Sequence, residues 1–253
     1  MRMCIFCVFE MVLLKCILGG MFVAVSCQQC EFCNHHSCMH RVPIFSSLTN
    51  EEMKQVQQII VHRYYKKGEY ILSPLKPMHC LFILNEGKVK VVRVNQSGKE
   101  QILYLLSIGD FFGETALFTG IPSDIVVEAL EDTRLCTISK AQFSALLKQL
   151  PDIALKVCEE LTHRLHRMET MVESLGSKPV DERMDDLLKE FSKKYGKYTS
   201  EGILIQLPLS REELANYLGL TRETVSRKLA KLQNEGVLKL MGHKQILLIH
   251  RKK

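Results

Sequence analysis

Residues 210 to 232 carry the pattern that most restricts the fold of this chain: two short amphipathic helices joined by a tight turn. Ser210 and Glu213 form a capping box, which starts the first helix by satisfying free backbone N–H groups. The apolar stripe of this helix is Leu214, Tyr217 and Leu218. Gly219 can take the left-handed conformation that ends a helix, and Thr221 can cap the next one. The sequence therefore predicts a helix-turn-helix unit.

The second of these helices has two opposite faces. At 100° per residue, one face is apolar and consists of Val225, Leu229 and Leu232. The other face carries Glu223, Ser226 and Arg227, which are residue types that recognise base edges in the major groove of DNA. We therefore predict a DNA-binding surface. Its residues are Ser210, Thr221, Arg222, Glu223, Ser226, Arg227 and Lys228.

Short strand-like runs precede this unit. They are Cys80–Leu84, Lys88–Val94, Gln101–Leu106, Ile125–Ala129 and Leu135–Ile138. Glycines separate them at roughly the spacing of an antiparallel barrel or roll. A capping box at Thr49 and Glu52 predicts a short helix ahead of the strands. Residues 237–240 and 245–249 predict a β-hairpin wing after the second helix.

A long helix is predicted between the strands and the helix-turn-helix. Apolar residues there alternate three and four apart, as in a coiled-coil seam. The seam is Cys158, Leu161, Leu165, Met168, Val172 and Leu175. One small roll cannot cover the whole seam of a helix longer than about twenty residues, so we expect two copies to pair through it as a homodimer.

The predicted fold is therefore α+β, in four parts. Residues 1–42 are a Cys-rich segment, 43–150 an antiparallel β-roll, 151–176 a dimerisation helix and 177–253 a winged helix-turn-helix domain. The net charge of +6 lies entirely in the last part, because residues 178–253 hold 16 Lys and Arg against 10 Asp and Glu. A basic domain beside a neutral one favours a polyanionic partner, here double-stranded DNA.

An enzyme is not expected. After residue 43 the sequence has no Gly-rich phosphate loop, no His-Glu-x-x-His motif and no isolated pair of carboxylates among apolar residues. A cysteine-based thiol oxidoreductase would therefore have to rely on the amino-terminal thiols alone.

Two motifs resemble those of the CRP/FNR superfamily, that of the cyclic-AMP receptor protein and the fumarate and nitrate reduction regulator. Gly109–Phe118 resembles the signature of its β-roll, and Leu218–Arg227 resembles its recognition motif. The resemblance covers about residues 43–250. It implies a roll like a cyclic nucleotide-binding jelly roll, a cytoplasmic homodimer on a palindromic operator, and RNA polymerase as a partner. Glu223, Ser226 and Arg227 match the oxygen-sensing branch, and Arg222 with Glu223 and Arg227 matches the cyclic-AMP branch as well, so these residues alone leave the half-site preference open.

Cyclic AMP is not expected as the effector. Cyclic-AMP binders of this superfamily hold the phosphate with an Arg-Ser pair shortly after the Gly-Glu signature, and the corresponding positions here are Asp124 and Ile125. A carboxylate repels a phosphodiester, and isoleucine donates no hydrogen bond. No arginine lies near these positions in the sequence.

The cysteines suggest another kind of sensor. Seven of the ten cysteines lie in the first 38 residues, and four of them have spacing that suits a metal: Cys27, Cys30, Cys33 and Cys38. In the iron–sulfur branch of the superfamily, three amino-terminal cysteines and one from the end of the roll hold a [4Fe-4S] cluster. Cys136 matches the distant position. The resemblance thus implies Cys30, Cys33, Cys38 and Cys136 as ligands, with Cys27 as the alternate.

Other uses of these cysteines stay open at this point. An amino-terminal cysteine and Cys136 could form a reversible disulfide without any metal. Zinc could be bound instead, because His35, His36 and His40 lie among the thiols. An exported lipoprotein modified at Cys27 is a further alternative. No apolar run in residues 3–26 approaches the roughly 20 residues of a membrane-spanning helix, so we expect no membrane anchor.

Overall fold

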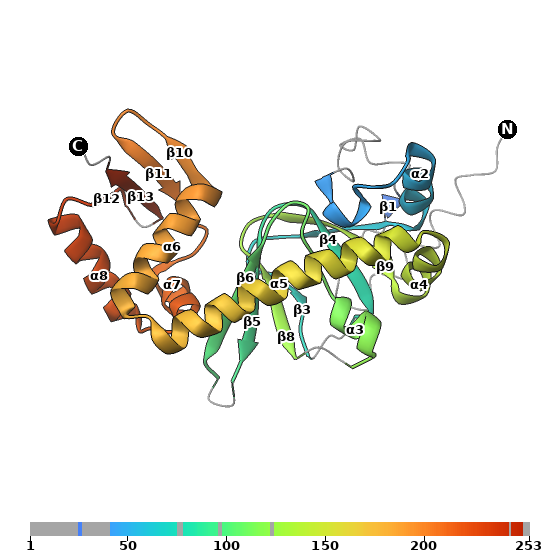
Figure 1. The fold of residues 1–253 in the computed structure, drawn as a ribbon, viewed down its shortest axis with the longest axis horizontal. Coiled ribbons are helices and arrows are strands. Elements are labelled where there is room, and N and C mark those ends of the chain that lie inside the picture. The colour runs from blue at the N-terminus through green and yellow to red at the C-terminus, as the bar shows by residue number, and fades with distance from the viewer. Residues whose placement is uncertain are drawn as a thin grey trace, which may run out of the picture.

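The computed structural model of the chain describes residues 25–26, 41–74, 78–95, 98–121, 124–242 and 244–249. The amino-terminal half is a β-roll flanked by helices (Figure 1). Its elements are β1 (Val25–Ser26), η3 (Pro43–Phe45), α2 (Asn50–Ile59), β2 (Val61–Tyr65), β3 (Tyr70–Leu72), β4 (Cys80–Glu86), β5 (Val89–Val94), β6 (Glu100–Leu106), β7 (Phe111–Phe112), α3 (Glu114–Thr119), β8 (Ile125–Ala129), β9 (Thr133–Ser139) and α4 (Lys140–Gln149).

Two antiparallel sheets form the roll. Their strand orders are β1-β2-β9-β4-β7 and β3-β8-β5-β6. Apolar side chains from both sheets fill the space between them, and the rings of Phe82 and Phe112 stack there with centroids 4.7 Å apart. Gly113, in the predicted roll signature, has a φ of +93°, and a Cβ atom here would collide with the carbonyl oxygen of Cys80. The signature therefore needs glycine at this position.

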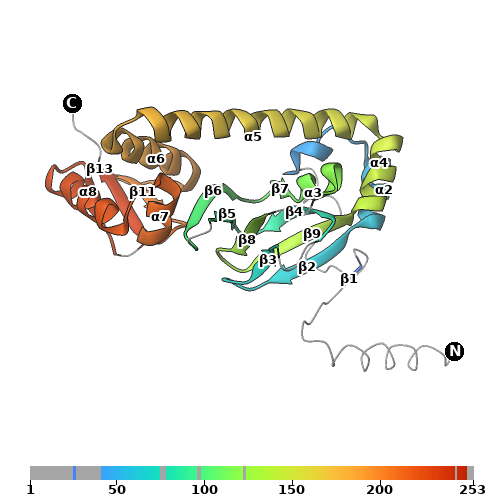
Figure 2. The same ribbon diagram turned by 90° about the horizontal axis from the view of Figure 1, so that it is seen from below.

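A single long helix joins the two halves of the molecule. It is α5 (Pro151–Ser177), 27 residues long, and it runs along the roll toward the carboxyl-terminal domain (Figure 2). Its first turns bury Ile153 and Val157 in a core shared with η3, α2 and α4. This packing fixes the start of α5 to the roll.

The carboxyl-terminal domain contains three helices and one sheet. Its elements are α6 (Val180–Tyr195), β10 (Gly196–Tyr198), β11 (Gly202–Gln206), α7 (Arg211–Leu218), α8 (Arg222–Asn234), β12 (Leu238–Leu240) and β13 (Gln245–Ile249). The sheet order is β10-β11-β13-β12. The predicted wing is confirmed as β12 and β13, and β10 and β11 extend it to four strands.

The α+β fold class and the capping box at Thr49 are confirmed. Two helices of the roll part, α3 and α4, were not predicted from the sequence. In α4 the missed signal is a further capping box, between Ser139 and Gln142. Within the described residues, none of the helices combines the length and the apolarity that crossing a bilayer requires.

Candidate DNA-binding surface and sensor site

The turn between α7 and α8 has the local geometry that the sequence predicts. The Ser210 backbone N–H donates to Glu213 Oε2 over 2.8 Å, and the Glu213 N–H donates to Ser210 Oγ over 3.3 Å, which closes the capping box. Gly219 has a φ of +65° and ends α7. The Thr221 hydroxyl then accepts the N–H of Thr224 at the start of α8. Both helix ends are therefore specified by local hydrogen bonds.

Helix α8 presents the predicted recognition face to solvent. Val225 and Leu229 are buried in the domain core. Five residues of the predicted surface are exposed: Thr221, Arg222, Glu223, Ser226 and Arg227. Within the described part of the chain, the guanidinium of Arg227 makes only a long 3.5 Å hydrogen bond, to the Thr224 hydroxyl. The side chains that match base edges are thus available to a ligand.

Three residues of the predicted surface have their main side-chain partners inside the protein. The side chain of Ser210 caps α7, and that of Thr221 caps α8. The ammonium of Lys228 pairs with the carboxylate of Asp181 on α6, and this hydrogen bond holds the pKa of Asp181 below its ordinary value. A DNA contact by Ser210 or Lys228 would compete with these bonds.

The six residues of the predicted dimer seam follow one side of α5 and differ in burial, and their pairing with a second copy stays a prediction. Leu175, at the end of the seam, is 39% exposed. Leu161 packs against the core beneath the helix, and Met168 lies over a small cavity beside β6. The solvent-facing stripe contains Cys158, Leu165 and Val172, with Leu165 57% and Val172 70% exposed. Sequence analysis missed a further member, Leu155, which is 64% exposed and lies three residues before Cys158. We call Leu155, Cys158, Leu165 and Val172 the outer stripe.

Cys136 lies in the middle of the first sheet of the roll. It is 4% exposed, and its Sγ atom lies 3.5 Å from Nδ1 of His62 on the neighbouring strand β2. The other ring nitrogen of His62, Nε2, is buried without a hydrogen-bond partner. Burial lowers the pKa of this imidazole. A buried thiol and a half-buried imidazole, whose charged form burial disfavours, therefore lie side by side.

The amino-terminal chain reaches the same part of the sheet. Strand β1 pairs with β2 so that Val25 lies opposite His62, and His62 in turn lies opposite Cys136 on β9. The predicted ligands Cys27, Cys30, Cys33 and Cys38, and the three nearby histidines, lie outside the described residues. Among the residues that the structure describes, no three His, Cys, Asp or Glu side chains come together as a metal site.

The positions that replace the Arg-Ser pair lie at the edge of the second sheet. Asp124 is exposed, and its carboxylate accepts a 2.9 Å hydrogen bond from the guanidinium of Arg93 on β5. The sequence places no arginine near Asp124, but the pairing of β5 with β8 brings this one close. Because Arg93 is paired with a carboxylate, it does not supply an unopposed positive charge for a phosphate.

A buried arginine ties α5 to the signature segment of the roll. Arg164 donates 2.7 Å hydrogen bonds to Glu114 and to the carbonyl oxygen of Phe111. Its guanidinium also lies 5.2 Å from the ring centroid of Tyr104 and 5.1 Å from that of Phe111. Sequence analysis missed Arg164, because an arginine within a charged helix normally indicates a solvated side chain. Its contacts link the roll directly to the long helix.

Comparison with known proteins identifies the family. Residues 62–150 match the model of the cyclic nucleotide-binding domain, and residues 182–253 match that of the Crp-like helix-turn-helix domain. The chain is 31% identical to the probable transcriptional regulator flp of Lacticaseibacillus casei, over 85% of this chain and 95% of the relative. The chain belongs to the CRP/FNR superfamily. As a member, it is a DNA-binding transcription regulator and not an enzyme.

Two further matches agree with membership of the CRP/FNR superfamily. The chain is 25% identical to the fumarate and nitrate reduction regulatory protein of Vibrio cholerae, over 90% of this chain and 88% of the relative. The solved structure of FixK2 from Bradyrhizobium japonicum superposes with a TM-score of 0.67 and 28% identity, over 76% of this chain and 94% of that one. The CRP/FNR fold predicted from the sequence is thereby confirmed.

Proposed function

We propose that this CRP/FNR regulator is a homodimer that binds a palindromic operator in response to oxygen or redox state, sensed through its cysteines. The observation that carries the sensing part is the position of Cys136, beside His62 and one strand from the place where the amino-terminal chain joins the sheet. Glu223, Ser226 and Arg227, exposed on α8, support direct recognition of bases.

The proposal requires an amino-terminal cysteine to reach Cys136, and the position of β1 supports this. Neighbouring strands lie about 4.8 Å apart, so β1 runs about 10 Å from β9. Cys30 is the fourth residue after Ser26, and an extended chain spans about 13 Å over four residues. A bond between this segment and Cys136, through a metal or a disulfide, needs no rearrangement of the sheet.

The first candidate for this bond is a [4Fe-4S] cluster held by Cys30, Cys33, Cys38 and Cys136. The described residues fit this group in one respect: Cys136 offers a buried sulfur 3.5 Å from the His62 ring, and it lines a small cavity together with Val42 and Ile60. When bound, such a cluster supplies a redox centre that oxygen can attack. The relatives include a fumarate and nitrate reduction regulatory protein, which supports the same branch.

A metal-free thiol switch is the second candidate. One amino-terminal cysteine and Cys136 would lose two electrons and two protons to an oxidant such as oxygen or peroxide, and would form one disulfide. Zinc bound by cysteine and histidine is the third candidate.

An absorption spectrum of protein purified without oxygen separates these candidates. The cluster predicts a broad visible band that bleaches in air, with iron bound to the protein. The disulfide predicts no visible band and the loss of two titratable thiols on oxidation. Bound zinc, with neither a visible band that bleaches in air nor a loss of thiols on oxidation, would contradict redox sensing.

The outer stripe of α5 supports the homodimer. Leu155, Cys158, Leu165 and Val172 expose apolar surface that a second copy of the helix would cover. In a parallel pair the two Cys158 side chains face each other across the two-fold axis. Mild oxidation should therefore give a covalent dimer that Cys158→Ser abolishes and Cys80→Ser retains. A covalent dimer that survives Cys158→Ser would contradict this seam.

Cyclic AMP is proposed not to be the effector, because Asp124 and Arg93 pair with each other where the phosphate would need donors. Titration with cyclic AMP should leave operator binding unchanged. By resemblance to the CRP/FNR superfamily, RNA polymerase is the proposed protein partner and the cytoplasm the proposed location.

A further inference from the structure

Lys90 is a buried lysine on the outer face of the roll, where a side chain would normally be exposed to solvent. It lies on β5, and its side chain is 7% exposed. The neighbouring residues Val89 and Val91 point into the roll, so Lys90 points out of it. The helix-turn-helix domain covers this outer face.

Three carboxylates surround the ammonium of Lys90. Glu213 of α7 lies 2.9 Å away, Glu128 of β8 3.0 Å and Glu100 of β6 3.9 Å. Burial disfavours the ammonium form, but the bonds to Glu213 and Glu128 outweigh this effect and raise the pKa of Lys90. The lysine is therefore charged at neutral pH and joins two strands of the roll to the first helix of the helix-turn-helix.

Other contacts continue this junction. The Gln101 side-chain amide on β6 donates a 2.6 Å hydrogen bond to the carbonyl oxygen of Asn216 on α7. Apolar residues of the roll share one buried cluster with the core of the carboxyl-terminal domain; they are Val92, Ile102 and Leu105. Figures 1 and 2 both show α7 beside the β5–β6 hairpin.

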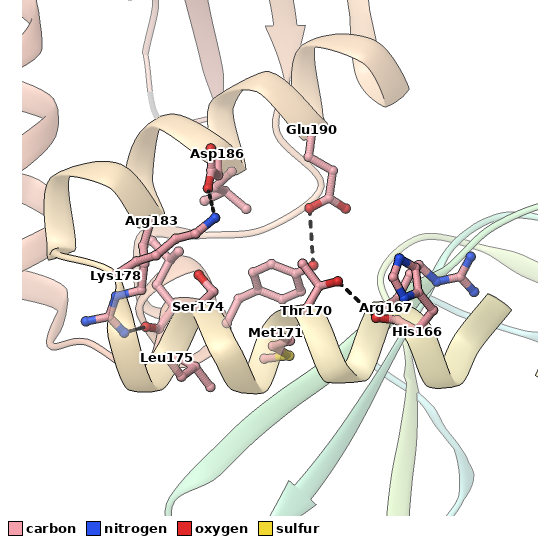
Figure 3. A pocket seen from close by; sticks show the side chains of 13 residues that line it. His166, Arg167, Thr170, Met171, Ser174, Leu175, Lys178, Arg183, Asp186 and Glu190 are labelled. Carbon is pink, nitrogen blue, oxygen red and sulfur yellow. Dashed lines mark hydrogen bonds and ion pairs between the residues drawn. The ribbon is translucent and has the colours of Figure 1, made fainter. Parts of the chain in front are cut away.

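The opposite side of the domain is packed less tightly. A cavity of about 390 Å³ separates the last turns of α5 from α6 and the end of α7 (Figure 3). Met171 and Leu187 line it, and the Lys178–Asp186 ion pair lies in its wall. The contact of α5 with the carboxyl-terminal domain is therefore interrupted by this gap, whereas β5 and β6 contact α7 directly.

We propose that Lys90 is a positioning residue, whose ammonium docks the helix-turn-helix domain on the β5–β6 hairpin and thereby sets the spacing of the two recognition helices. The inference rests on the proposed homodimer, since only a dimer has a spacing to set. Two half-sites of a palindrome lie about 34 to 36 Å apart, and rigid docking matches both recognition helices to that distance before DNA binds.

Two variants test this proposal. Lys90→Met removes the ammonium and keeps most of the apolar stem. Glu213→Gln removes one carboxylate charge and keeps the capping box, because glutamine also serves at the third position of the box. Glu52→Gln makes the same change in the capping box of α2, away from this interface, and is the matched control.

Hydrogen exchange of the protein without DNA measures docking. Lys90→Met should accelerate exchange in both α7 and β6 at least tenfold, Glu213→Gln should do so to a smaller extent, and Glu52→Gln should leave both unchanged. Unchanged protection in Lys90→Met and Glu213→Gln would overturn the proposal.

Binding to DNA at fixed salt measures positioning. Lys90→Met should lose at least tenfold in affinity for the palindromic operator and less than twofold for a single half-site. Equal losses of affinity for the palindrome and the half-site would overturn the proposal. A gain of affinity for the palindrome would also overturn it, because the docked arrangement would then oppose DNA binding. A monomeric parent protein would contradict the homodimer instead, and hydrogen exchange would still decide the docking.

Discussion

At the scale of single residues, the exposed face of α8 assigns different roles to two adjacent basic side chains. Arg227 is exposed and has only a long bond to Thr224, whereas Lys228 is paired with Asp181. A bidentate contact of arginine with guanine contributes about 1 to 3 kcal/mol of discrimination. Arg227→Ala should therefore lose that much specific binding and relax the preference at one base pair of each half-site.

The matched control for this change is Lys228→Ala, which alters charge by the same amount on the same helix. Its effect on affinity should be similar for all DNA sequences, because phosphate contacts carry no base preference. Binding to a set of single-base operator variants measures both changes. If Arg227→Ala leaves the base preference intact, α8 is not the recognition helix.

The buried pair of Arg164 and Glu114 predicts a loss of stability. Their side chains are only 10% and 13% exposed. Arg164→Met leaves the carboxylate buried without its partner, which should cost about 3 to 5 kcal/mol of unfolding free energy. Adding Glu114→Leu should restore most of this loss, because replacing both charges by apolar groups is often nearly neutral. Urea unfolding measures both, and an Arg164→Met protein as stable as the parent would contradict the pair.

At the scale of elements, α5 packs one side on its own roll and leaves the outer stripe exposed, which is the proposed dimer interface. Leu165 is exposed on the outer stripe, whereas Leu161 packs on the core. Leu165→Glu would place two like charges across the two-fold axis and should give a folded monomer that no longer binds the palindrome.

Sedimentation with two further variants completes this test of α5. Leu161→Glu should destabilise the fold of each chain, because it places a charge against an apolar core. His163→Glu, on the face turned away from the outer stripe, should stay dimeric. A dimeric Leu165→Glu protein would exclude the outer stripe as the interface.

The elements differ in how far the sequence alone predicts them. Helix ends at Ser210 and Gly219 were predictable because their signals are local hydrogen bonds and a backbone conformation that favours glycine. The burial of individual seam residues on α5 was not predictable, because the whole seam repeats with one heptad period and only the position of the roll covers Leu161 and Met168 more than the others. Lys90 was missed for the same reason: strand alternation places it outside the roll, and only α7 buries it.

The candidate sites also divide into those with local sequence signals and those that depend on contacts between distant segments. The face of α8 is fixed by one helix, so its residues were predicted together. The neighbour of Cys136 was not, because His62 is 74 residues away in the chain and meets it only through the pairing of β2 with β9. The link between Glu114 and Arg164 spans 50 residues and has no local signal either.

At the scale of the whole molecule, one continuous series of elements and contacts connects the candidate sensor residue Cys136 to the helix-turn-helix domain. Cys136 lies on β9, which leads through α4 directly into α5. Arg164 then fixes α5 to the roll, and Lys90 joins the roll to α7. A bond that ties the amino-terminal segment to β9 therefore acts at the base of the helix that carries the outer stripe.

This path predicts what Cys136→Ser does. A bond at Cys136 can change DNA affinity only if it favours one dimer geometry over another. A bond that is equally compatible with both geometries leaves the equilibrium between them unchanged. We expect Cys136→Ser to abolish the difference in operator binding between oxygen-free and oxidised protein and to leave binding to nonspecific DNA unchanged. Cys80→Ser is the matched control, since Cys80 lies at the start of β4 in the same sheet.

Iron content measured in the same variants separates the two candidate switches. The cluster requires iron in the parent protein and its loss in Cys136→Ser, whereas the disulfide requires no iron in either protein. A full redox difference that persists in Cys136→Ser would exclude both, and would confine the switch to the amino-terminal thiols.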